Sequence, residues 1–325
     1  MRPRKSSERI SFASALKGMR GSFRAGDISG LRKTYTEARE KNPFLKGLLR
    51  LIERFYPVPG MLEMAESLDR RIAEHGLGRA SRETLEEIGI DWEYHLPQGS
   101  EDVLKSAPVI FYGNHPSMLT PFLIAAAVDR TDIRILMISY VGHLIPSLSR
   151  LILPIELPLN RPLTELRRGG AKHLIALWLV SRLHDVPQRA LAKAINRRSL
   201  QAAVDHVRAG GSVAIFPAGG GRAERRWYPG IGTLAKGLAE ESVKQPVYLV
   251  PIREYNSSNH RVYTSLAGSK TARARRRLLY RRPIRIEFAE PIRLDRLPLD
   301  PLSAHNIAAW LKRHYDGIFP LPTAA

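Results

Sequence analysis

The sequence predicts an α/β protein with a mixed, mainly parallel sheet covered by helices and with an N-terminal helical appendage. From about residue 90, short apolar runs that end at Gly, Asn or Pro alternate with helical segments, which is typical of strands in an α/β sheet. Before that point the apolar residues recur every three or four positions, as in amphipathic helices. We therefore expect three parts: a basic N-terminal segment (1–25), a helical appendage (26–88) and an α/β domain (89–325).

The first 88 residues contain several helix signals. Residues 1–25 are basic and contain serines, so we expect them to be ordered only if they dock on another part of the protein. The stretch FLKGLLRLIERFY has helical spacing, and Pro57 ends that helix. A second helix is expected to end at Gly76, and a third to be capped by Ser81.

Beyond residue 88 the predicted strands and helices alternate. Residues 172–184 are helical and apolar nearly all round, so they form either a core or interface helix or an element that covers a bound apolar chain or dips into a membrane. The other expected helices are 121–130, 141–153 (interrupted by Pro146), 198–210 and 232–242, and the expected strands are 90–96, 107–114, 133–140, 155–159, 212–219, 247–255 and 283–292.

Composition limits the possible partners. The 325 residues include no cysteine, which excludes disulfides and thiolate chemistry, and 51 basic against 31 acidic residues give a net charge of +20. Such an excess implies an anionic partner: a membrane surface, nucleic acid or an anionic substrate. No nucleic-acid-binding motif is present, which makes nucleic acid the least favoured partner. No apolar run is long enough to span a bilayer, so contact with lipid is expected at the surface.

Two strings place reactive residues directly after predicted strands. VIFYGNHPSMLTP puts Asn114 and His115 at the end of one apolar run, and GGSVAIFPAGGGR puts a glycine turn at the end of another. Loops at the carboxyl ends of strands are where α/β sheets bind ligands. A histidine there can transfer a proton, and glycines there allow backbone N–H groups to converge on an anion.

The two strings resemble the signatures of glycerolipid acyltransferases of the lysophosphatidate-acyltransferase type, Asn-His-x4-Asp and Phe-Pro-Glu-Gly-Thr-Arg. Asn114 and His115 match the first signature, but Thr120 stands where the family has aspartate. The second signature appears as F-P-A-G-G-G-R, in which Ala218 replaces the glutamate. Two weaker blocks also occur in family order, one containing Arg161 and one at VYLVPI (247–252).

The resemblance implies acyl transfer from acyl-CoA or acyl carrier protein to a hydroxyl of a lysophospholipid or related lipid, at the cytoplasmic face of a membrane. It implies no tightly bound cofactor and no metal. A catalytically inactive homologue that binds lipid or acyl carrier is the alternative. His115 would be the base, with Thr120 in the place of the acid, and the implied substrate-binding residues are Asn114, Ser117, Arg161, Phe216, Pro217, Gly219, Gly220, Gly221 and Arg222.

Thr120 can play more than one part. Followed by Pro121, it has the pattern of a helix N-cap, so it either caps a helix alone or also holds His115. Asp129 and Asp132 are later acids that could reach the histidine. If Thr120 only weakens a histidine–acid pair, Thr120→Asp should raise turnover.

A basic run near the C-terminus is the expected membrane contact. SKTARARRRLLYRRP contains no acid, and clusters of this kind beside apolar residues bind anionic lipid. A solvated loop is the alternative. The residues expected to contact the membrane are Arg273, Arg275, Arg276 and Arg277.

Overall fold

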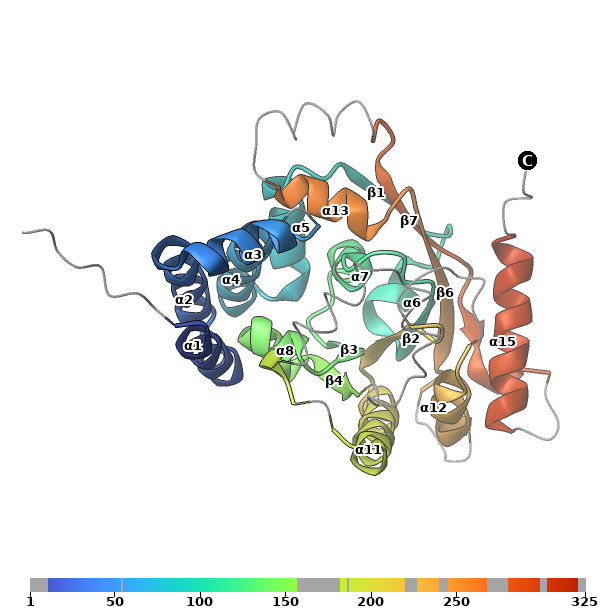
Figure 1. The fold of residues 1–325 in the computed structure, drawn as a ribbon. Coiled ribbons are helices and arrows are strands. Elements are labelled where there is room, and N and C mark those ends of the chain that lie inside the picture. Colours follow the sequence, from blue (N-terminus) through green and yellow to red (C-terminus); the bar gives the residue numbers. More distant parts are fainter. Residues whose placement is uncertain are drawn as a thin grey trace, which may run out of the picture.

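The computed structural model describes residues 11–53, 55–156, 182–185, 187–219, 227–239, 245–267, 280–298 and 303–320. Its centre is an eight-stranded sheet in the order β1-β7-β6-β2-β5-β3-β4, with β8 paired to β6 (Figure 1). Among the described strands, five pairings are parallel and two, β6–β7 and β6–β8, are antiparallel, so β1, β7 and β8 run opposite to the other five strands. This confirms the predicted mixed, mainly parallel sheet. The strands are β1 Trp92–His95, β2 Val109–Gly113, β3 Ile133–Ile138, β4 Ile152–Ile155, β5 Ser212–Ile215, β6 Tyr248–Tyr255, β7 Ile284–Phe288 and β8 Ile292–Arg293.

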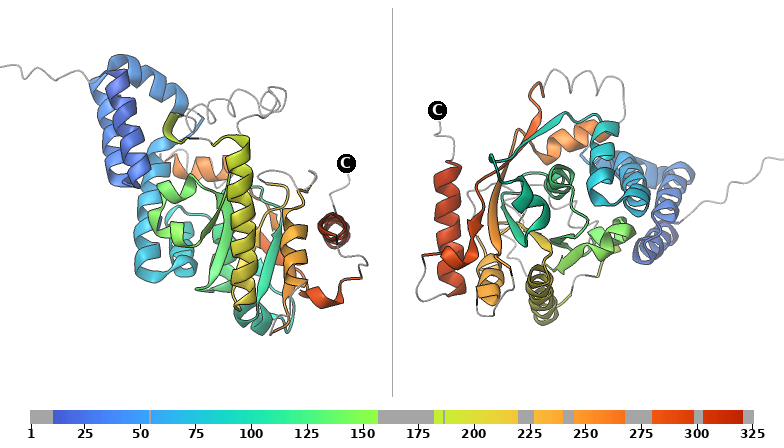
Figure 2. Two further views of the ribbon diagram at one scale, coloured as in Figure 1. Left: turned by 90° about the horizontal axis from the view of Figure 1, so that it is seen from below. Right: turned by 180° about the vertical axis from the view of Figure 1, so that it is seen from behind.

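Helices cover both faces of the sheet because its central strands are apolar on both sides. In β2, Phe111 packs with one face, and Ile110 and Tyr112 pack with the other. The first face is covered by α4 (Val58–His75), α5 (Leu77–Glu87), α7 (Thr120–Val128) and α13 (Asn259–Leu266). The opposite face is covered by α11 (Arg189–Arg208), α12 (Gly230–Ala239) and α15 (Ala304–Ile318) (Figures 1 and 2).

The helical appendage begins earlier than the sequence pattern predicts. Residues 12–25 form α1 (Phe12–Ala25), which packs against α2 (Ile28–Lys41), and α3 (Pro43–Glu53) packs on α2 in turn. Ser11 caps α1, since its side chain accepts a hydrogen bond from the backbone N–H of Ser14 (3.1 Å). Ala15 and Phe23 of α1 are buried in one apolar cluster with Leu31 and Tyr35 of α2. The docking needed to order the N-terminal segment is therefore present for residues 12–25.

Several predicted boundaries need correction. Ser81 does not cap a helix: it lies buried inside α5, which starts directly after Gly76. The strand expected to begin at residue 155 begins at Ile152, which pairs with Ile135 of β3, while residues 157–159 of that expectation lie outside the described residues. Residues 141–153 break at Pro146, as expected, into α8 (Val141–Leu144) and a short 3-10 helix (Pro146–Arg150). The sequence pattern missed α6 (Glu101–Ser106), α13 and α15.

Candidate active site

The site forms where the carboxyl ends of β2 and β6 lie side by side. Gly113 pairs with Ile252 in the parallel register, and a Cβ on Gly113 would lie 1.9 Å from the Ile252 carbonyl oxygen, so only glycine fits. The side chain of Asn114 then binds the backbone of Glu254 twice: its Oδ1 accepts from the Glu254 N–H (2.9 Å) and its Nδ2 donates to the Glu254 carbonyl (3.2 Å). Asn114 thus clamps the β2 loop to β6.

The structure brings the two sequence strings together at His115. Its imidazole stacks on the ring of Phe216, with centroids 4.7 Å apart and planes 24° from parallel. Nδ1 of His115 is buried and has no hydrogen-bond partner among the described residues. Burial lowers the pKa of His115 from 6.5 to about 4, because the charged imidazolium loses its hydration. The imidazole is therefore neutral at physiological pH and able to accept a proton.

Thr120 does not cap α7 through its side chain. It is the first residue of that helix, and its hydroxyl binds the Ser117 carbonyl (2.9 Å) and the carboxyl group of Glu254. Ser117 supports the start of the helix, since its Oγ accepts from the Leu119 N–H (3.2 Å) while donating to Glu254 Oε1 (2.8 Å). Position 120, where the resembling acyltransferases have aspartate, therefore carries the Thr120 hydroxyl, which contacts the carboxyl group of Glu254 on β6.

The two later acids considered from sequence are engaged elsewhere. Asp129, at the far end of α7, forms an ion pair with Arg82 (2.6 Å). Asp132 forms one with the buried Arg130 (2.6 Å). Each of these acids is therefore paired away from His115. Glu254, which contacts Ser117 and Thr120 after the histidine, is a buried acid that sequence reasoning missed. Its signal was a carboxylate in the apolar strand VYLVPIREY, but the sequence does not reveal that this strand lies beside β2.

The second loop is described only in part. Phe216, Pro217 and Gly219 form a turn in which the Gly219 N–H donates to the Phe216 carbonyl (2.9 Å). Gly219 has φ +68°, a conformation that favours glycine. Gly220, Gly221, Arg222 and Arg161 lie outside the described residues, as do Arg273, Arg275, Arg276 and Arg277.

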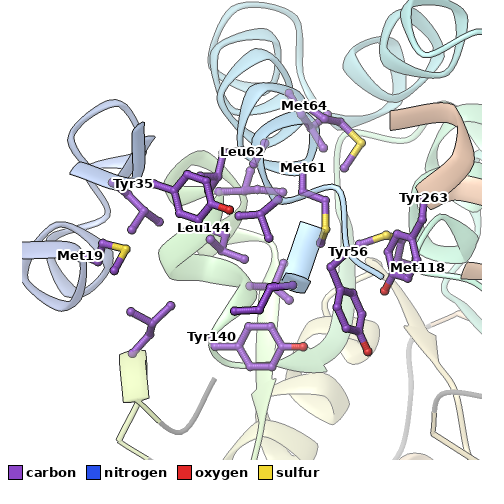
Figure 3. Close-up of a pocket in the computed structure, with 18 of the residues that line it drawn as sticks. Met19, Tyr35, Tyr56, Met61, Leu62, Met64, Met118, Tyr140, Leu144 and Tyr263 are labelled. Atoms are coloured by element: carbon purple, nitrogen blue, oxygen red, sulfur yellow. The ribbon is translucent and has the colours of Figure 1, made fainter. Parts of the chain in front are cut away.

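An apolar cavity of about 430 Å³ lies between the appendage and the α/β domain, with His115 in its wall. This volume is in the range of sites for small molecules. Every methionine other than Met1 lines it, and methionine adapts its shape to apolar ligands. Figure 3 shows tyrosines at its margin, with Tyr56 and Tyr263 close to Met118. The labelled lining residues are Met19, Tyr35, Tyr56, Met61, Leu62, Met64, Met118, Tyr140, Leu144 and Tyr263.

Within the described ranges, no three His, Asp or Glu side chains come together as metal ligands. Among the described helices, none combines the length and apolar character needed to cross a bilayer.

No known protein family's sequence model matches the chain, and no curated protein sequence matches it. One similar solved structure is the crystal structure of a 1-acyl-sn-glycerophosphate (LPA) acyltransferase, PlsC, from Thermotoga maritima. The similarity covers 80% of this chain and 98% of that chain, with 14% sequence identity and a TM-score of 0.34. A TM-score this low supports no conclusion about the site, so function rests on the residues themselves.

Proposed function

We propose that this protein is an acyltransferase that moves a fatty acyl group from acyl-CoA or acyl carrier protein to a hydroxyl of a lysophospholipid or related lipid. The observation that carries the proposal is a neutral histidine in the wall of an apolar cavity. The cavity is suited to the acyl chain, and the imidazole is suited to take the hydroxyl proton. The motif strings around Asn114 and Phe216 favour this reaction class over other uses of such a site.

The proposed reaction is direct transfer. The acceptor oxygen attacks the thioester carbonyl carbon while its proton passes to His115. The tetrahedral intermediate then collapses, the carbon–sulfur bond breaks, and the thiolate leaves with the proton from the imidazolium. Gly219, Gly220, Gly221 and Arg222, with Arg161, are proposed to hold the phosphate of the acceptor, since glycine turns and guanidinium groups both bind anions.

A kinetic assay with a matched control tests the proposal. His115→Ala should lower the rate of thioester release with a lysolipid acceptor by roughly 10²–10⁴-fold, the usual contribution of a general base. The control is His95→Ala, since His95 is exposed on β1 and should leave the rate unchanged. A His115→Ala variant that turns over like the wild type would contradict the mechanism.

We also propose that the protein works as a peripheral protein on the cytoplasmic face of an anionic membrane. On α3, Phe44 (72% exposed) and Leu51 (53% exposed) lie among the exposed bases Lys46 and Arg50. The opposite side of α3 lines the cavity through Leu45 and other apolar residues. An acyl chain that leaves the bilayer beside α3 would therefore be close to the cavity. The arginines from 273 to 277 are proposed as further contacts.

Flotation with anionic vesicles tests this surface. Phe44→Ser combined with Leu51→Ser should weaken binding, because both substitutions remove apolar area that inserts at the interface. Leu191→Ser is the control, since Leu191 is exposed on α11, on the opposite side of the sheet. Added salt should weaken wild-type binding as well. Equal binding to neutral and anionic vesicles at all salt concentrations would argue against the electrostatic part.

The second candidate function is a non-catalytic lipid- or acyl-carrier-binding protein. The observation that favours it is the buried Nδ1 of His115, which has no hydrogen-bond partner within the described part of the chain, since a working base is usually oriented by an acid on that nitrogen. Mass spectrometry of co-purifying lipids, combined with no thioester release from any donor, would identify this alternative.

A further inference from the structure

Glu254 is a buried acid that the reaction above does not use. It is 4% exposed near the end of β6, and both of its carboxyl oxygens bind the loop that carries His115. Oε1 accepts from the Ser117 hydroxyl (2.8 Å), and Oε2 contacts the Thr120 hydroxyl. The same loop is tied to the Glu254 backbone through Asn114. A structural link to the loop could be made by the backbone alone, so the buried carboxyl group needs its own explanation.

The Thr120 hydroxyl can serve Glu254 in both of its protonation states. Its oxygen lies within hydrogen-bond distance of the Ser117 carbonyl and of Glu254 Oε2, but it has only one proton to donate. When Glu254 is ionised, the hydroxyl donates to the carboxylate. When Glu254 is protonated, the hydroxyl accepts from the acid and donates to Ser117. An aspartate at position 120 could not do this beside Glu254, which gives a physical reason for threonine here.

Opposing influences act on the ionisation of the Glu254 carboxyl group. Burial raises the pKa of Glu254, whereas the hydroxyl groups of Ser257, Thr120 and Ser117 and the guanidinium of Arg261 on α13 lower it. Arg261 is itself buried, at 4% exposed, and its Nη1 donates to the Asn256 carbonyl (2.8 Å). His115 lies on the same loop, two residues before Ser117 and five before Thr120. The hydroxyl groups and Arg261 therefore favour the ionised carboxylate against the effect of burial.

We propose that Glu254 is a positioning residue for His115: it holds the loop through Ser117 and Thr120, and its ionised form stabilises the imidazolium that forms during acyl transfer. It would replace, from a neighbouring strand, the acid that the family has five residues after the histidine. The inference rests on the proposed function for its kinetic part. In a buried site a carboxylate can act without direct contact, because the surroundings screen charge weakly.

The contribution of Glu254 to turnover and its contribution to stability should depend on pH in opposite directions. If the ionised form is the active one, turnover rises as pH rises through the raised pKa of Glu254. Stability behaves in the reverse way: an acid whose pKa is raised on folding loses its stabilising contribution as pH rises from its unfolded to its folded pKa. A glutamine does not titrate. Glu254→Gln should therefore lower turnover and remove the rise of turnover with pH. The stability of this variant relative to the wild type should increase as pH rises.

The experiment compares full-length variants in the thioester-release assay and in urea unfolding at pH 5.5 and pH 8.5. Glu254→Gln should lower kcat at least tenfold with KM nearly unchanged. Combining it with Thr120→Asp, which moves a carboxyl group to the family's position, should recover a large part of the loss. Glu290→Gln is the control, because Glu290 is exposed. A folded Glu254→Gln variant with kcat within twofold of the wild type would overturn the proposal.

Thr120→Asp alone provides a further check. It places two buried carboxyl groups against each other, so one must be protonated, and turnover should fall. This is the reverse of the expectation from sequence, and a rise in turnover with Glu254 intact would overturn the proposal. If the wild type transfers no acyl group, the proposed function fails, but the unfolding data still test the ionisation of Glu254. A stability difference between Glu254→Gln and the wild type that is the same at both pH values would show that Glu254 does not titrate as a buried acid.

Discussion

The two faces of the sheet are built differently. On the face covered by α11, α12 and α15, aromatic rings fill the space: Tyr112, Trp227 and Tyr315 contact one another, with centroids 5.2–6.4 Å apart. The other face also has a buried apolar cluster next to the strands, but farther out, against the appendage, it leaves the cavity of about 430 Å³. Figure 3 shows residues that line this cavity. His115 lies on the loop after β2, and Thr120 begins α7 on this face.

The difference indicates that one face of the sheet contributes mainly to stability and the other mainly to ligand binding. The filled face fixes the strands and therefore the carboxyl edge on which the site is built. The hollow face leaves apolar surface for a ligand at the cost of packing contacts that a solid core would make. Stability should thus depend mainly on the filled face, and ligand preference mainly on the hollow one. Three experiments test this division.

The largest expected difference in stability is between Leu311→Ala and Met61→Ala. Leu311 is fully buried on α15 in the filled face, so its truncation leaves a new cavity and should cost roughly 2–5 kcal/mol. Met61 already borders the open cavity and loses fewer contacts, so its truncation should cost about 1 kcal/mol. Urea unfolding measures both values. Equal losses would show that the cavity is collapsed in solution.

A smaller effect is expected from filling the cavity. Met64→Trp adds volume to its lining and should exclude about two methylene groups of a bound chain, at about 0.8 kcal/mol each. The preference between long and short acyl donors should therefore shift about tenfold toward the short ones, as measured by kcat/KM. Leu191→Trp introduces the same side chain on exposed α11 and serves as the control. An unchanged chain-length preference would place the acyl chain outside this cavity.

The smallest effect is expected from Tyr112→Phe on the filled face. The Tyr112 hydroxyl is buried without a hydrogen-bond partner in the described part of the chain, and burial raises its pKa. Removing an unsatisfied hydroxyl while keeping the ring should leave stability unchanged or raise it by up to about 1 kcal/mol. Thermal unfolding at neutral pH measures this. A clear loss of stability would mean that the hydroxyl has a partner after all.

Patterns in the sequence were informative where short-range chemistry decides the structure. The apolar runs before Asn114 and Phe216 predict β2 and β5, because buried parallel strands need continuous apolar residues. Helix α1 was missed because its apolar face, with Ala15 and Phe23, is narrow and lies among basic residues. The Ser81 cap was wrong because the helix starts at Leu77 and takes Ser81 into its interior.

The sequence by itself determined the class of fold, the positions of most strands along the chain and the two loops that carry His115 and Phe216. Those features follow from local periodicity, glycine and proline positions and residue chemistry. Only the tertiary structure decided that β6 lies beside β2, and with it the contact between Glu254 and Thr120 and the cavity beneath the appendage. Strand order and helix docking depend on contacts between residues far apart in the chain, and no local pattern contains that information.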